Sequence, residues 1–229
     1  MKKGPEDRTV QGVVETALRQ LGWQDRSILA AGRTDTGVHA AGQVIAFNLD
    51  WKHSVEELQR ALNANLPPDI AARLVRITQA SFHPRYAALA RRYRYRIYCE
   101  PVRDPLRERY AWRVWPVVDL EAMRQAALAL PGTHDFAAFG TPPRIGGSTI
   151  RSVSQAGWLS EGAELVFEIV GNAFLYHMVR RLVFAQVAIG QGRLEPGTIR
   201  KNLKGSPESM VQGLAPPQGL TLVEVIYPA

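Results

Sequence analysis

A short segment between two glycines carries residues that could act together in catalysis. Gly32 and Gly37 bracket Arg33 and Asp35, and His39 follows two residues later. Arg33 and Asp35 are two residues apart, so in extended backbone their side chains point to the same side. A carboxylate can act as a nucleophile or a general base. An Arg–Asp pair can also be a surface ion pair that contributes little energy. The spacing alone favours this second interpretation.

Two apolar runs flank this segment, and each predicts a short buried strand. A short loop on such strands is where sheet proteins often place chemistry. Thr9 and Ser54 are predicted N-caps, and Ser54 opens a capping box with Glu57. The elements predicted in this half are helices over 10–21 and 54–62 and strands over 28–31, 44–47 and 70–77.

The second half continues the alternation of helices and strands. Asp119 is a predicted N-cap, Gly132 ends the helix that follows it, and residues 141–148 are a predicted loop. Further predicted elements are strands over 92–98, 149–158, 164–170 and 220–226, and helices over 176–190 and 197–203. The whole order predicts the α+β class, with helices against a mostly antiparallel sheet.

The predicted strand over 92–98 alternates strictly between basic and apolar or aromatic side chains. One face carries Tyr93, Tyr95 and Ile97, and the other carries Arg92, Arg94 and Arg96. Such a strand can contact RNA, because arginines hold phosphates and tyrosines stack on bases. It can equally have a tyrosine core face and a solvated arginine face, and the pattern does not separate the two.

Arg180 lies in the long apolar helix predicted over 176–190. A partly buried arginine requires a carboxylate or phosphate partner, and Asp35 is a candidate. Its guanidinium can instead extend along the helix to water.

Composition restricts the class of protein. Lys and Arg number 28 against 21 Asp and Glu, a net charge of +7 that favours nucleic-acid partners. Cys99 is the single cysteine, so no intrachain disulfide can form, which suits a reducing compartment. Neither a secretory signal nor a membrane-spanning run is predicted, and we expect a cytoplasmic, soluble protein. The five scattered histidines predict no metal site, and no phosphate-binding loop or serine elbow is present.

Several motifs in order resemble the tRNA pseudouridine synthase A family, and the likeness runs from about Thr9 to Pro228. The matching segments are 31–40, 63–67, 82–85, 90–95, 172–174, 177–180 and 213–214. The resemblance implies a pseudouridine synthase fold of two ferredoxin-like halves, over 1–81 and 82–229, around a basic cleft. It also implies a homodimer that isomerises uridines in the anticodon stem-loop of tRNA, at positions 38–40, without a cofactor.

The resemblance further implies a role for each matching residue. Asp35 corresponds to the catalytic aspartate, Tyr93 to the tyrosine packed against the target uracil, and Arg180 to the arginine that pairs with the aspartate. Arg33 is expected to position the loop or the RNA. A cation beside a carboxylate favours its ionised form, as nucleophilic or basic action requires.

Family members usually begin with a strand before the first helix, and residues 1–8 are too polar to predict one. Two alternatives to the isomerase are therefore considered. The first is an RNA-binding protein whose catalysis is impaired by the missing strand. The second is a hydrolase that uses Asp35 with His39.

Overall fold

The computed structural model describes residues 8–204 and 211–228, and contacts divide the chain into two units. The first unit runs to Ala31 and resumes over Val44–Ala87. The second comprises Gly32–Gln43 and the chain from Ala88 onward. The expected boundary at residues 81–82 lies close to the change of unit after Ala87. The loop that contains Asp35, however, was expected in the first half and is grouped with the second unit.

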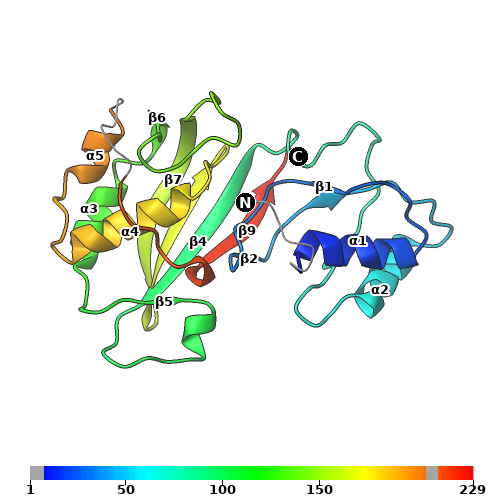
Figure 1. Cartoon of the computed structure of the whole chain (residues 1–229), viewed down its shortest axis with the longest axis horizontal. Coiled ribbons are helices and arrows are strands. Elements are labelled where there is room, and N and C mark those ends of the chain that lie inside the picture. Colours follow the sequence, from blue (N-terminus) through cyan, green and yellow to red (C-terminus); the bar gives the residue numbers. More distant parts are fainter. Residues whose placement is uncertain (1–7, 205–210, 229) are drawn as a thin grey trace. The chain divides into compact units, whose positions relative to one another are not determined.

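The first unit packs two helices with a two-stranded antiparallel sheet (Figure 1). Its elements are α1 (Val10–Gln20), β1 (Leu29–Ala30), β3 (Ile45–Ala46) and α2 (Val55–Asn65). Both predicted N-caps are confirmed: the Thr9 side chain accepts from the Gly12 N–H, and Ser54 and Glu57 form the complete capping box. The core of this unit contains Leu18, Trp23, Ile28, Leu58 and Leu62.

The prediction of a strand over 70–77 is wrong. Side chains of α2 form hydrogen bonds with backbone groups of this segment that would otherwise pair with a neighbouring strand. The Asn63 amide bonds both the N–H and the carbonyl of Ala72, at 2.8 and 2.9 Å. Gln59 donates to the carbonyls of Ala72 and Arg73. Ala72 and Val75 still pack against the core. The apolar pattern of this segment therefore reflects burial of its side chains and not pairing with another strand.

The second unit is built on a seven-stranded sheet in the order β2-β9-β4-β8-β7-β6, with β5 beside β4. Its pairs are antiparallel except β2 with β9 and β4 with β5. The strands are β2 (His39–Ala40), β4 (Ala90–Tyr98), β5 (Trp112–Arg113), β6 (Gly132–Asp135), β7 (Ile150–Glu161), β8 (Glu164–Gly171) and β9 (Leu220–Ile226). The short strands β2, β5 and β6 were not predicted.

The described part of this unit contains three helices: α3 (Leu120–Ala127), α4 (Met178–Gly190) and α5 (Thr198–Asn202). Helices α3 and α4 pack on one face of the sheet and share its core (Figure 1). Single 3-10 turns occur over Arg107–Arg109 and Pro217–Gly219. The predicted N-cap Asp119 is confirmed, and the predicted strand over 220–226 coincides with β9.

The two faces of β4 differ as its alternation predicts. Tyr95 and Ile97 are fully buried in the core. On the other face each arginine pairs with glutamates of β7, β8 and β9: Arg92 with Glu168 and Glu224, Arg94 with Glu161 and Glu168, and Arg96 with Glu164. This face is a ladder of opposite charges, which favours the core-and-surface interpretation of the strand over a free basic surface.

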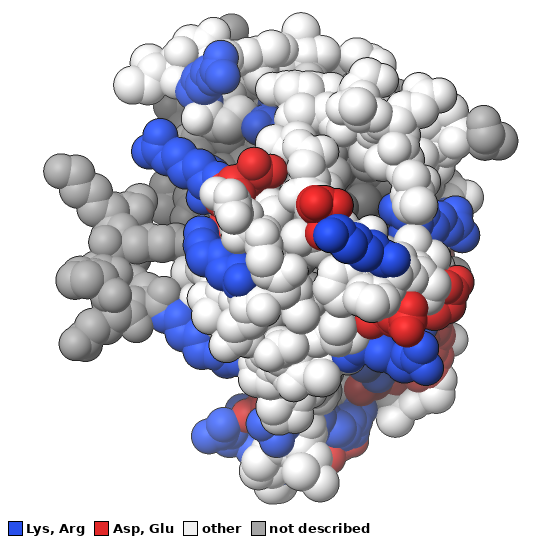
Figure 2. Space-filling view, turned by 90° about the vertical axis from the view of Figure 1, so that its right-hand side faces the viewer, with Lys and Arg blue, Asp and Glu red and all other residues white. Residues whose placement is uncertain are grey.

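The antiparallel-dominated mixture of helices and strands confirms the α+β class. Two ferredoxin-like halves remain a prediction, and the expected absence of a first strand falls on residues 1–8, of which 1–7 lie outside the described residues. None of the helices described is both long and apolar enough to cross a bilayer. On the face in Figure 2, Lys and Arg side chains are interspersed with acidic and uncharged ones, so no single-sign patch covers that face.

Candidate active site

The loop that carries Asp35 is fixed to the second unit through β2 and β9. Strand β2 pairs in parallel with β9, and the N–H groups of Ala41 and Gly42 both donate to the Leu222 carbonyl, at 2.8 and 3.2 Å. Gly42 approaches so closely that a Cβ there would lie 2.2 Å from the Val223 carbonyl oxygen. Only glycine permits this approach, and it sets the position of the loop.

A tight turn within the loop presents Asp35. The Val38 N–H donates to the Asp35 carbonyl at 3.1 Å, and Gly37 adopts the left-handed region at φ +83°. The Gln43 side chain donates to the Gly32 carbonyl at 3.0 Å and holds the two ends of the loop together. The loop is therefore a constrained segment, as a reacting carboxylate requires.

Asp35 forms an ion pair with Arg180, the third residue of α4. The Arg180 Nη1 donates to Asp35 Oδ2 at 2.7 Å, and its Nε donates to the Ala215 carbonyl at the same distance. The side chains are only 10% and 19% exposed for Arg180 and Asp35, so water screens the pair little. The structure thus brings together the two residues that the sequence suggested as partners.

His177 is a third member of this cluster and was not among the predicted site residues. Its Nε2 lies 3.5 Å from Asp35 Oδ2, and its ring stacks on Tyr176 with centroids 3.6 Å apart. Burial lowers the pKa of His177 below its ordinary value; Asp35 opposes this shift, and Arg180 and Arg181 add to it. Its spacing from Arg180 could have identified it from the sequence. His177 is three residues before Arg180, and residues three apart lie on the same face of a helix.

The two oxygens of Asp35 have different surroundings. Oδ2 takes the contacts with Arg180 and His177. Oδ1 makes no hydrogen bond or ion pair with any residue that the structure describes. The carboxylate also lies at the N-terminal end of α4, which has no acidic residue in its own first turn. The positive end of the helix dipole favours a negative charge there.

Tyr93 lies on β4 and is partly buried, with its ring edge-on to Phe174 at a centroid distance of 5.1 Å. Burial raises the pKa of Tyr93 to about 12; the Arg91 charge opposes this rise and the Asp35 charge adds to it. Its hydroxyl is therefore protonated at neutral pH.

Arg33 and His39 do not join Asp35. Arg33 is exposed and forms no ion pair with Asp35 among the described residues, so the surface-pair interpretation is wrong. The His39 Nε2 lies 3.0 Å from the Arg109 carbonyl oxygen, and its ring packs against Tyr110. The histidine beside the carboxylate is His177, which weakens the hydrolase alternative.

Comparison with known proteins identifies the family. A family model described as tRNA pseudouridine synthase matches residues 1–87 and 126–228. The chain belongs to the tRNA pseudouridine synthase family. The tRNA pseudouridine synthase A of Geobacter sp. (strain M21) is 38% identical over 225 residues, which are 98% of this chain and 91% of that protein.

Two further relatives bear the same name. That of Geobacillus kaustophilus is 40% identical over 226 residues, covering 97% of this chain and 87% of its own length. That of Thermotoga neapolitana is 39% identical over 227 residues, covering 97% and 91%. As a member of the tRNA pseudouridine synthase family, this chain is an isomerase.

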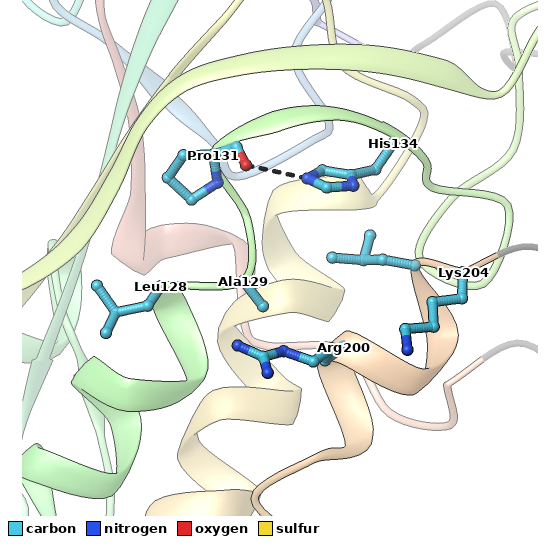
Figure 3. Close-up of a pocket in the computed structure, with 7 residues that line it drawn as sticks. Leu128, Ala129, Pro131, His134, Arg200 and Lys204 are labelled. Atoms are coloured by element: carbon cyan, nitrogen blue, oxygen red, sulfur yellow. Dashed lines mark hydrogen bonds between the residues drawn. The ribbon is translucent and has the colours of Figure 1, made fainter.

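A separate hollow of about 360 Å³ lies beside α3, β6 and α5 in this tRNA pseudouridine synthase (Figure 3). It is lined by Leu128, Ala129, Pro131, His134, Arg200, Leu203 and Lys204. The His134 ring bonds the Pro131 carbonyl at 3.0 Å. None of Asp35, Tyr93 and Arg180 lines this hollow, so it is distinct from the candidate active site.

No group of three or more His, Cys, Asp or Glu side chains is placed to hold a metal ion within residues 8–204 and 211–228. Reaction without a metal or cofactor stays a prediction for this enzyme.

Proposed function

We propose that this chain isomerises uridine to pseudouridine in the anticodon stem-loop of tRNA, at positions 38–40, with Asp35 as the catalytic carboxylate. The observation that carries the proposal is the Asp35–Arg180 pair, in which one carboxylate oxygen is held and the other is left for the substrate. The reaction breaks the C1′–N1 bond, turns the uracil and joins C1′ to C5, while C5 releases its proton and N1 gains one. No electrons are exchanged, so no redox cofactor is required.

The environment of Asp35 suits this chemistry. The Arg180 charge and the positive end of α4 both favour a carboxylate anion. The unpaired Oδ1 is available to attack the base, to attack the sugar or to take a sugar proton, and each of these roles requires the ionised form.

Tyr93 and Arg33 are proposed to hold the RNA. The target base must leave its stack to reach a carboxylate on the protein, and the Tyr93 ring offers a face against which the uracil can pack. The edge contact with Phe174 supports that ring. Arg33 is exposed on the loop that carries Asp35, where its charge can meet a backbone phosphate.

We also propose that the enzyme acts as a homodimer in the cytoplasm. The single cysteine and the net charge of +7 fit a reducing compartment and a polyanionic partner. Sedimentation in solution should give a mass twice the 25.4 kDa of the chain. A mass equal to one chain would contradict the homodimer and leave the isomerase proposal intact.

The decisive assay measures pseudouridine formation in unmodified tRNA by the wild-type chain and by Asp35→Asn. This substitution keeps the shape of the side chain and removes its charge, so we expect tRNA binding to persist and product formation to cease. Site-resolved mapping should place the product at positions 38–40.

Three results would count against the proposal. An active Asp35→Asn variant would exclude Asp35 as the catalytic group, and product at other uridines would exclude the assigned positions. Binding without product by the wild-type chain would favour the RNA-binding alternative.

A further inference from the structure

His177 is held in an unusual backbone conformation immediately before α4. Its φ of +66° places a residue with a Cβ in the left-handed region, a strained conformation that persists only where the surroundings enforce it. It is the N-cap position of the helix, yet its side chain makes no capping hydrogen bond. The strained backbone therefore does not serve to cap the helix.

The conformation instead carries the imidazole to Asp35. The Nε2 lies 3.5 Å from Oδ2, the same oxygen that Arg180 contacts at 2.7 Å. The stack on Tyr176, at 3.6 Å and 27° between ring planes, holds the imidazole from its other side. The His177 side chain is 19% exposed, so the contact with Oδ2 is largely shielded from water.

A single contact to one carboxylate oxygen leaves the group free to turn. Rotation about the terminal torsion of an aspartate is broad and nearly two-fold, so Arg180 alone could exchange one oxygen for the other. A second group beside Oδ2 removes this freedom and keeps Oδ1 directed away from α4. Holding a reacting atom in this way raises the rate, because less ordering is needed at the moment of reaction.

We propose that His177 is a positioning residue for Asp35, which keeps Oδ2 on Arg180 and Oδ1 toward the substrate. This role rests on the proposed catalytic function of Asp35. His177 contacts the carboxylate of Asp35, and in this role it acts in its neutral form. Protonation would place a second cation beside Oδ2 and make the carboxylate a weaker nucleophile and base.

The groups around His177 favour the neutral form near neutral pH. Partial burial disfavours a proton on the imidazole, Asp35 on the loop attracts one, and Arg180 and Arg181 on α4 disfavour it; Tyr176 is the stacked neighbour. The balance lowers the pKa. We therefore expect kcat to fall as the pH drops below the ordinary histidine value of about 6.5.

The test compares His177→Asn, His177→Gly and the matched control His134→Asn. Asparagine tolerates the left-handed region and does not titrate, and glycine adopts it without strain. His134 lies on β6 in the same unit, away from the site. The measurements are kcat and KM for pseudouridine formation in unmodified tRNA from about pH 5 to pH 8, the Kd for tRNA and the Tm.

Both His177 variants should lose kcat by about 10-fold to 100-fold at neutral pH, with KM and Kd within about two-fold of wild type. The acid fall of kcat near the histidine range should flatten in both. The His134→Asn variant should match wild type throughout. Because neither replacement strains the backbone, we expect little change in Tm.

A His177→Asn variant with wild-type kcat and pH profile would overturn the proposal, and so would a KM rise that accounts for the whole loss of kcat/KM. Full activity in His177→Gly would likewise show that the imidazole is not needed. Failure of the proposed function is seen separately, as absence of product with the wild-type chain or persistence of product with Asp35→Asn.

Discussion

Arg180 makes two directed contacts that a lysine cannot reproduce. Its planar guanidinium donates to Asp35 Oδ2 and to the Ala215 carbonyl at once, whereas an ammonium is a point charge on a flexible stem. We expect Arg180→Lys to lower kcat for pseudouridine formation by about 100-fold, because the carboxylate loses its fixed orientation. Arg193→Lys, a change at an exposed arginine, is the control. Wild-type kcat in Arg180→Lys would show that charge alone suffices.

Tyr93 offers its ring rather than its hydroxyl. Since burial raises the pKa of this phenol to about 12, the hydroxyl carries no charge at neutral pH. Tyr93→Phe should therefore bind unmodified tRNA with nearly wild-type Kd, and Tyr93→Ala should lose about 1–3 kcal/mol of affinity, the usual value of one stacked base. Equal affinities of the two variants, measured by filter binding, would contradict stacking.

At the scale of elements, the attachment of the Asp35 loop to β9 decides whether a site forms. A Cβ on Gly42 would meet the backbone of Val223 at 2.2 Å, and backbone cannot move aside as a flexible side chain can. We expect Gly42→Ala to lower the free energy of unfolding by about 1–3 kcal/mol, as overpacking does, and to lower kcat as Asp35 shifts.

The matched control is Gly157→Ala on β7, where a Cβ would have no heavy atom within 4 Å. Urea unfolding, followed by tryptophan fluorescence, gives the free energy of unfolding of each variant. Equal values for Gly42→Ala and Gly157→Ala would mean that β2 and β9 accommodate the methyl group, and that the close approach does not fix the loop.

At the scale of the whole molecule, a net charge of +7 governs association with a polyanion. We expect log K for tRNA to fall linearly with log salt, because phosphate contacts release counterions. Arg33→Gln should reduce that slope by about one, as the loss of one phosphate contact does.

Arg94→Gln is the control, since Arg94 is already paired with Glu161 and Glu168. It removes the same charge from the chain, so it separates a local contact from net charge. If the slope of log K against log salt decreases equally in the two variants, Arg33 has no contact of its own with RNA.

Features that depend on neighbours along the chain could be predicted from the sequence. The caps at Thr9, Ser54 and Asp119 form as predicted, because each needs only a side chain and an N–H within three residues. The alternation of β4 predicted its buried and charged faces for the same reason. The motif order indicated the family, and a buried arginine that needs an anion pointed to Asp35 as its partner.

Contacts between distant segments became clear only from the folded chain. His177 reaches Asp35 across more than a hundred positions of sequence, and patterns among neighbouring residues do not predict such a contact. Residues 70–77 have an apolar pattern, yet side chains of α2 take their backbone groups. The arginines of β4 meet glutamates of β7, β8 and β9. The local sequence pattern predicts which side chains are buried and where the chain turns. The hydrogen-bond or ion-pair partner of each polar group depends instead on how the whole unit packs.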